Sequence, residues 1–137
     1  MEIGSLQALE FMKTHVVKTT PDESLSGAID LMDLYQAHEL PVVNSEGILC
    51  GMITESDIRS AIPRDWHAQK IQVGILKVSD FMTKEVISVS EHSDFRETAI
   101  MMFEKNLKRI PVTTNEGKVI GTLNRVDILQ AIFEGIL

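Results

Sequence analysis

Two aspartates, Asp57 and Asp127, close similar stretches of the chain that lie 70 residues apart. The first closes GMITESD, which runs from Gly51 to Asp57. If this segment ends a strand and opens a helix, its unpaired backbone N–H groups and the helix dipole favour an anion. The hydroxyls of Thr54 and Ser56 can donate to anion oxygens, whereas the Asp57 carboxylate is suited to accept hydrogen bonds from vicinal hydroxyls. The pattern therefore favours an anionic group at the helix start and a hydroxyl donor at the carboxylate.

The same residues also fit a local role at a helix start. Thr54-x-x-Asp57 is a capping-box pattern, in which a hydroxyl and a carboxylate satisfy the first N–H groups of the helix. Asn124-x-x-Asp127 fits a related template, because asparagine is a good N-cap residue. The sequence leaves both roles open, and one side chain can fulfil both.

The second stretch departs from the first just before its aspartate. Where the first has Thr54-Glu55-Ser56, the second has Asn124-Arg125-Val126, so both hydroxyls are lost. Arg125 could supply positive charge instead. We expect the stronger site at Asp57 and a weak or empty one at Asp127.

Apolar spacing places these motifs on the same elements in both halves. A short apolar strand is expected first, at Val16–Val17 and again at Val86–Val89. A helix follows, because apolar residues recur at i, i+3, i+4 and i+7. Two strands around a turn that ends in Glu-Gly come next, at 40–43 and 48–53 in the first half, and a second helix begins directly afterwards. Each half thus reads β-α-β-β-α, as expected of one structural unit used twice.

The composition narrows the class of protein. The chain has 137 residues, 44% of them hydrophobic and 24% charged, which is typical of a globular domain. No apolar run approaches the roughly 20 residues of a membrane span, and the first residues lack the features of a signal peptide, so a cytoplasmic setting is expected. The net charge of −7 disfavours a nucleic-acid partner, and the single cysteine, Cys50, excludes an internal disulfide.

Both halves carry a Leu/Ile-Pro-Val strand, a Glu-Gly turn and Gly-x-x-Thr/Asn-x-x-Asp at constant spacing. Because of these repeated motifs, the chain resembles the cystathionine-β-synthase (CBS) domain family, and two such units in tandem resemble a Bateman module. The implied fold is α/β (α+β), with two β-α-β-β-α CBS repeats packed pseudo-symmetrically. We place repeat 1 at residues 1–62, a linker at 63–70 and repeat 2 at 71–137. Bacterial stand-alone CBS proteins of the acetoin-utilisation type are also similar.

The resemblance implies a regulatory module that binds an adenosine ligand: AMP, ADP, ATP, NAD(H) or S-adenosylmethionine. It further implies a homodimer that signals ligand state to an effector protein by a conformational shift. We expect no enzyme, no catalytic residue and no metal, because phosphate-loop, dinucleotide and metal-ligand spacings are missing from the sequence. A ligand-free dimerisation module remains the alternative, and a nucleic-acid regulator is disfavoured by the acidic charge.

In the family, the aspartate holds the ribose, basic residues before the Pro-Val strand reach phosphates, and the adenine lies against the first strand of the other half. Lys108 and Arg109 could instead be a solvated basic pair, and Met52 a core residue of its strand. Carried onto this sequence, the nucleotide-binding residues are Thr54, Ser56, Asp57, Met52, Val86, Lys108, Arg109, Asp127, Arg125, His15 and Val16.

Overall fold

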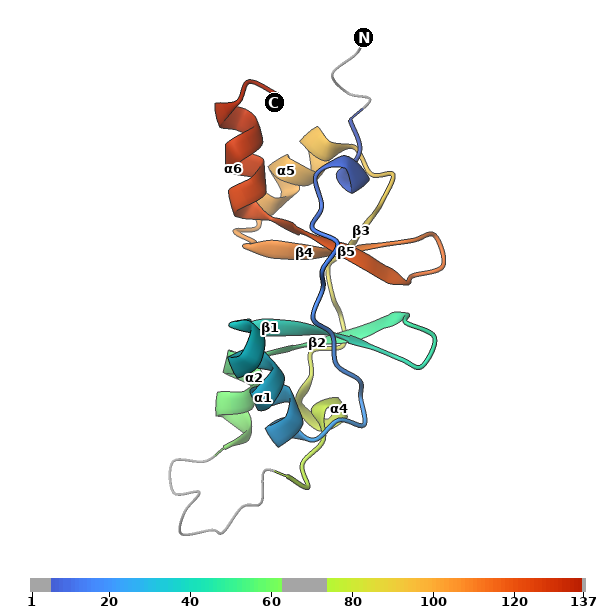
Figure 1. The fold of residues 1–137 in the computed structure, drawn as a ribbon, viewed down its shortest axis with the longest axis vertical. Coiled ribbons are helices and arrows are strands. Elements are labelled where there is room, and N and C mark those ends of the chain that lie inside the picture. The colour runs from blue at the N-terminus through green and yellow to red at the C-terminus, as the bar shows by residue number, and fades with distance from the viewer. Residues whose placement is uncertain (1–5, 63–73, 137) are drawn as a thin grey trace. The chain divides into compact units, whose positions relative to one another are not determined.

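The computed structural model describes residues 6–62 and 74–136, which form two compact units (Figure 1). The N-terminal unit spans Val17–Val86, and the C-terminal unit joins the chain up to Val16 to the chain from Ile87 onward. Relative to the sequence repeats, the units have therefore exchanged their first segments. The expected linker at 63–70 lies outside the described residues.

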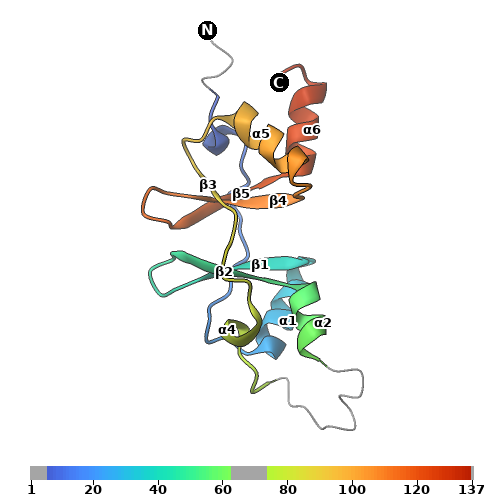
Figure 2. The same ribbon diagram turned by 180° about the vertical axis from the view of Figure 1, so that it is seen from behind.

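In the N-terminal unit, two helices cover one side of an antiparallel hairpin (Figures 1 and 2). Leucine, alanine and methionine on the inner face of the first helix are buried against the hairpin, as the apolar spacing predicts. The elements in chain order are α1 (Leu25–Tyr35), β1 (Glu39–Val43), β2 (Leu49–Thr54), α2 (Glu55–Ala61) and α4 (Val78–Phe81).

The C-terminal unit repeats this arrangement and adds a third strand. Its sheet has the order β3-β4-β5, with β3 parallel to β4 and β4 antiparallel to β5. Helices α5 and α6 lie on the same side of that sheet (Figures 1 and 2). The elements are η2 (Ala8–Glu10), β3 (Val89–Ser90), α5 (Phe95–Glu104), β4 (Arg109–Thr113), β5 (Val119–Asn124) and α6 (Arg125–Phe133).

The expected first strands are wrong in position and length. Residues Val16–Val17 form no strand, and only Thr19 makes an isolated parallel bridge, to Val42. In the second half, the strand is confined to Val89–Ser90. The reason is topological: the chain passes from one unit to the other after Val16 and after Val86, so pairing with the sheet of the unit that it enters begins only beyond these points.

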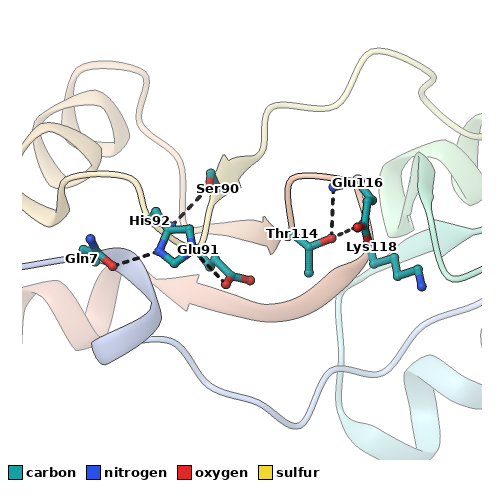
Figure 3. A network of polar contacts seen from close by, with 7 residues as sticks. All are labelled: Gln7, Ser90, Glu91, His92, Thr114, Glu116 and Lys118. Carbon is teal, nitrogen blue, oxygen red and sulfur yellow. Dashed lines mark hydrogen bonds and ion pairs between the residues drawn. The ribbon is translucent and has the colours of Figure 1, made fainter.

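The segment around η2 belongs to the C-terminal unit. The N–H of Ala8 donates to the carbonyl of Ser93 at 2.9 Å, and Gln7 Oε1 lies 3.0 Å from His92 Nδ1 (Figure 3). The Phe11 ring stacks on Phe95, which is fully buried, with 3.9 Å between the ring centroids. Such an aromatic pair contributes about 0.5–1.5 kcal/mol beyond the area it buries.

The segment around α4 attaches to the N-terminal unit in the equivalent way. The N–H of Leu25 donates to the carbonyl of Leu76 at 2.8 Å, and the N–H of Val78 donates to the carbonyl of Glu23 at 2.9 Å. Val78 is fully buried in the core of this unit. Each unit thus completes its core with a segment from the other half of the sequence.

Both hairpin turns are fixed by a polar side chain and a glycine. Asn44 Oδ1 accepts from the N–H of Glu46 at 2.9 Å, and Thr114 Oγ1 accepts from that of Glu116 at 3.3 Å (Figure 3). Gly47 has a φ of 81° and Gly117 one of 89°, a conformation that side-chain-bearing residues rarely adopt. The Glu-Gly turns predicted from the sequence are therefore confirmed.

None of the described helices is both long enough and apolar enough to cross a membrane. The half-buried Cys50 thiol donates to the Val42 carbonyl at 3.3 Å, and desolvation raises its pKa.

Candidate functional site

The glycine of each motif marks the place where a segment from the other sequence half meets the hairpin. Thr83 exchanges two backbone hydrogen bonds of 2.9 Å with Met52, and a Cβ on the neighbouring Gly51 would lie 3.0 Å from the Thr83 carbonyl oxygen. At the equivalent place, a Cβ on Gly121 would lie 2.8 Å from the carbonyl oxygen of Lys13. Only glycine permits this approach without a shift of backbone, which explains its presence in both repeats.

This pairing brings candidate residues from the two sequence halves into the same unit. Val86 belongs with Asp57 to the N-terminal unit, three residues beyond the Thr83 bridge. His15 and Val16 belong with Asp127 to the C-terminal unit, shortly after the Lys13 bridge to Thr122. Their role in binding a ligand stays a prediction.

Asp57 forms hydrogen bonds with the N-cap residue of its own helix. Its N–H donates to Thr54 Oγ1 at 3.1 Å, and its Oδ2 accepts from the Thr54 N–H at 3.0 Å, which completes a capping box at the start of α2. The capping reading of Thr54-x-x-Asp57 is thus confirmed. Ser56 lies on the first turn of α2 with an exposed side chain, and Met52 is half-buried on β2.

Asp127 takes part in no capping box and instead contacts a lysine. Asn124 occupies the N-cap position of α6, but its side chain makes no capping hydrogen bond. Asn124 Oδ1 and Asp127 Oδ2 are both buried, and within the described chain neither has a hydrogen-bond partner. The other carboxylate oxygen, Asp127 Oδ1, lies 3.5 Å from Lys13 Nζ. Buried acceptors are normally satisfied, because an unpaired one costs about 1–3 kcal/mol, so this pair is suited to receive donors from a ligand.

Cationic residues lie near Asp127 at the start of α6. The N–H of Arg125 donates to the Lys108 carbonyl at 2.8 Å, and Arg109 is the strand neighbour of Asn124 across β4 and β5. The side chains of Lys108 and Arg109 are exposed, and Arg125 Nη1 donates to the Asn106 side chain at 2.9 Å. With Lys13, four cationic residues of the described chain lie near the start of α6, and Lys13 is the one whose side chain contacts Asp127.

Lys13 is the residue that sequence reasoning missed. Its repeat partner is Thr83, which is uncharged, so comparison of the two repeats did not indicate a charged site residue at this position. Its contact with Asp127 spans more than 100 residues and follows from the exchange of first segments.

The corresponding surroundings of Asp57 are acidic. Glu39 is the strand neighbour of Thr54 and occupies the position of Arg109 in the repeat, while Glu55 occupies that of Arg125. His38, at the position of Lys108, has its Nδ1 3.0 Å from Glu55 Oε1. At these repeat positions, the described residues near Asp127 are cationic, whereas those near Asp57 are two glutamates and a histidine. Among the described residues, no group of three or more His, Cys, Asp and Glu side chains could hold a metal ion.

Thr54 makes a side-chain capping bond and Asn124 does not, so the two residues should contribute differently to the free energy of unfolding. We expect Thr54→Ala to lower the free energy of unfolding by about 1 kcal/mol, because it removes a side-chain cap. The matched Asn124→Ala should cost much less, because no side-chain cap bond is lost at α6. Urea unfolding of both variants tests this. Equal losses would mean that Asn124 caps α6 in solution.

Comparison with known proteins identifies the family. The CBS domain model matches residues 8–64 and 78–134, so the chain belongs to the CBS domain family. It is 31% identical over 124 residues to an inosine-5'-monophosphate dehydrogenase of Methanocaldococcus jannaschii, with 90% of this chain aligned but only 23% of the dehydrogenase. It is 29% identical to a CBS domain-containing protein of Dictyostelium discoideum, over 82% of this chain and 81% of that protein.

Solved structures show the same fold. The CBS-pair protein CBSX2 of Arabidopsis thaliana has a TM-score of 0.80 at 23% identity, over 95% of this chain and 96% of that one. CBSX2 has also been solved in complex with AMP, with a TM-score of 0.77 over 93% of this chain and 96% of that one, at 24% identity. The CBS domain pair of protein MJ0100, solved with 5'-methylthioadenosine and S-adenosylmethionine, has a TM-score of 0.72 at 24% identity, over 95% of this chain and 97% of that one. The predicted class, a mixed α and β tandem CBS protein, is thus confirmed.

Proposed function

We propose that this chain is a regulatory module that binds an adenosine-containing ligand and signals ligand state to an effector protein. Membership of the CBS family supports this, as do the complexes of CBSX2 with AMP and of MJ0100 with adenosyl ligands. The observation that carries the proposal for this chain is the pair of buried, unpartnered oxygens of Asn124 and Asp127. The match to the dehydrogenase covers only part of that enzyme, and our proposal for this chain is non-catalytic.

The ribose is assigned to Asp127. Two vicinal hydroxyls of a ribose are donors, and the Asp127 carboxylate offers the acceptor that they need. One oxygen of the Asp57 carboxylate, Oδ2, already accepts from the Thr54 backbone, so a ribose that uses both carboxylate oxygens there shares one of them with the cap. In this proposal, Asp127 is therefore the stronger site, the reverse of the order expected from the sequence.

The phosphates are assigned to the same unit. Lys108, Arg109 and Arg125 lie near the start of α6, where cationic side chains and helix N–H groups favour an anion. Beside Asp57, Glu55 on the first turn of α2 opposes an anionic ligand. A phosphorylated nucleotide such as AMP, ADP or ATP thus fits the Asp127 site, and any ligand at Asp57 would be one without phosphate charge.

Signalling requires that the ligand change a surface that another molecule reads. Helix α6 begins beside Asp127, and two turns later it exposes Ile132 and Phe133. A ligand that favours one position of α6 shifts the population toward one form of this surface. We propose that the module acts as a homodimer and that an effector protein recognises the favoured form.

A ligand-free interaction module is the second candidate. The complete capping box at Thr54 and Asp57 favours it, because it explains that motif without a ligand. Exposed apolar residues on α5 and α6 are also compatible with a function in assembly alone.

A thermal-shift panel separates the two candidates. A ligand present at 100 times its dissociation constant adds about 2.7 kcal/mol to the free energy of unfolding. We expect AMP, ADP or ATP to raise the melting temperature, and guanine nucleotides to serve as the matched control, with NAD(H) and S-adenosylmethionine included. A panel in which no adenosine compound shifts the melting temperature favours the ligand-free module.

A further inference from the structure

Lys13 and Asp127 form a loose ion pair at the candidate site. Lys13 Nζ lies 3.5 Å from Asp127 Oδ1, which is longer than the distance of about 2.7–2.9 Å in a charge-assisted hydrogen bond. The side chain of Asp127 is only 17% exposed, whereas that of Lys13 is 61% exposed. The carboxylate is therefore held by the protein around it, and the lysine side chain is the partner that is free to turn into solvent.

The backbone of Lys13 is fixed beside the site although its side chain is exposed. Its N–H donates to the Thr122 carbonyl at 2.8 Å, and its carbonyl accepts from the Thr122 N–H at 2.9 Å. Thr122 lies two residues before Asn124, the last residue of β5. Rotation about the flexible four-carbon stem of Lys13 can therefore move the ammonium away from Asp127 while the residue stays near the start of α6.

The fold does not require a charge at this position. The repeat partner of Lys13 is Thr83, which makes the same pair of backbone hydrogen bonds, with Met52. The N-terminal unit thus attaches its segment to the hairpin without a lysine. A role for the Lys13 charge in ligand binding therefore does not conflict with a role in folding.

A ribose at Asp127 competes with Lys13 for the carboxylate. In the proposed function two hydroxyls donate to Asp127, and Lys13 already contacts one of its two oxygens, Oδ1. An exposed ion pair changes an equilibrium constant by at most about fivefold, so the shorter hydrogen bonds of the hydroxyls displace it. The displaced ammonium then lacks a counter-ion unless the ligand itself brings one.

We propose that Lys13 is a specificity-determining residue, which leaves Asp127 when the ribose binds and pairs with a phosphate of the same ligand. A nucleoside displaces Lys13 and offers it no new partner, whereas a nucleotide replaces the lost ion pair by a charge-assisted hydrogen bond. The Asp127 site therefore selects phosphorylated ligands against neutral nucleosides. This inference rests on the proposed function and names the residue that couples ribose binding to phosphate binding.

The substitution Lys13→Met tests this exchange, because methionine keeps much of the apolar stem and removes the charge. We expect adenosine to bind about threefold more tightly, since its competitor for Asp127 is gone. ATP should bind about tenfold more weakly, since a partner of its phosphates is lost. Calorimetry on the full chain gives both dissociation constants, and the loss for ATP should be larger at low salt.

The opposite signs of the two effects distinguish this role from simpler ones. A purely structural lysine would change both constants in the same direction, and a phosphate contact independent of Asp127 would leave adenosine binding unchanged. Lys13→Arg retains the charge and should restore the preference for ATP. Lys118→Met is the matched control and should alter neither constant, because Lys118 is exposed in the turn before β5, at the opposite end of that strand from Asn124 (Figure 3).

The outcomes separate this inference from the proposed function. A parent chain that binds neither adenosine nor ATP overturns both. If the parent binds ATP but Lys13→Met does not bind adenosine more tightly, the inference alone is overturned. A parent that binds adenosine more tightly than ATP has the same consequence. If Lys118→Met reproduces the effects of Lys13→Met, their cause is the net charge of the chain, and the role assigned to Lys13 is wrong.

Discussion

Replacing Asp127 by asparagine should weaken the binding of adenosine and of ATP alike by at least tenfold. The carboxylate is assigned two charge-assisted hydrogen bonds to ribose hydroxyls, each worth about 1.5–3 kcal/mol. Loss of half of each of the two bonds amounts to about 1.5–3 kcal/mol, and about 1.4 kcal/mol corresponds to a factor of ten. Stability should change little, because Asp127 Oδ2 has no hydrogen-bond partner in the described chain and the ion pair of Oδ1 with the exposed Lys13 contributes only about 0–1 kcal/mol. Calorimetric dissociation constants for both ligands provide the measurement.

Asp57→Asn is the matched control, and it should show the opposite pattern. It disturbs the capping box with Thr54, so we expect a loss of roughly 0.5–1 kcal/mol in the free energy of unfolding and little change in affinity. Arg109→Ala should weaken ATP but not adenosine, and more strongly at low salt, because its assigned partner is a phosphate. If Asp57→Asn abolishes binding and Asp127→Asn does not, the order of the two sites is the one that the hydroxyls in the sequence indicated.

Replacing Phe95 by alanine should cost about 3–5 kcal/mol in the free energy of unfolding, the largest effect that we expect of a single substitution. Phe95 is fully buried and stacks on Phe11, which comes from the other end of the chain. Hydrogen exchange should therefore accelerate most at residues 8–13 and in the C-terminal unit.

The repeat partner of Phe95 supplies the control. Leu25→Ala should cost about 2–5 kcal/mol, because Leu25 is fully buried in the core of the N-terminal unit. Its effect on exchange should be greatest at residues 25–54 and around α4. A response of residues 8–13 to Leu25→Ala rather than to Phe95→Ala would contradict the assignment of these residues to the C-terminal unit.

The local elements of this protein were predictable from the sequence because they depend on neighbours along the chain. The spacing of Leu25, Ala28 and Met32 defines the buried face of α1, and these residues are indeed buried. The Glu-Gly turns are set by positive φ angles at Gly47 and Gly117, and the capping box of Thr54 by residues three apart. The 70-residue repeat extended each of these predictions from one half to the other, and the family followed from the repeated motif.

Only the tertiary structure decided which segments share a unit and which acceptors lack a partner. No local pattern shows that residues 8–13 complete the core around Phe95, because the contact joins distant parts of the chain. The sequence fits Asn124 to the same N-cap template as Thr54, yet only Thr54 makes the bond. The difference lies in side-chain orientation, which packing and long-range neighbours such as Lys13 determine and residue type does not.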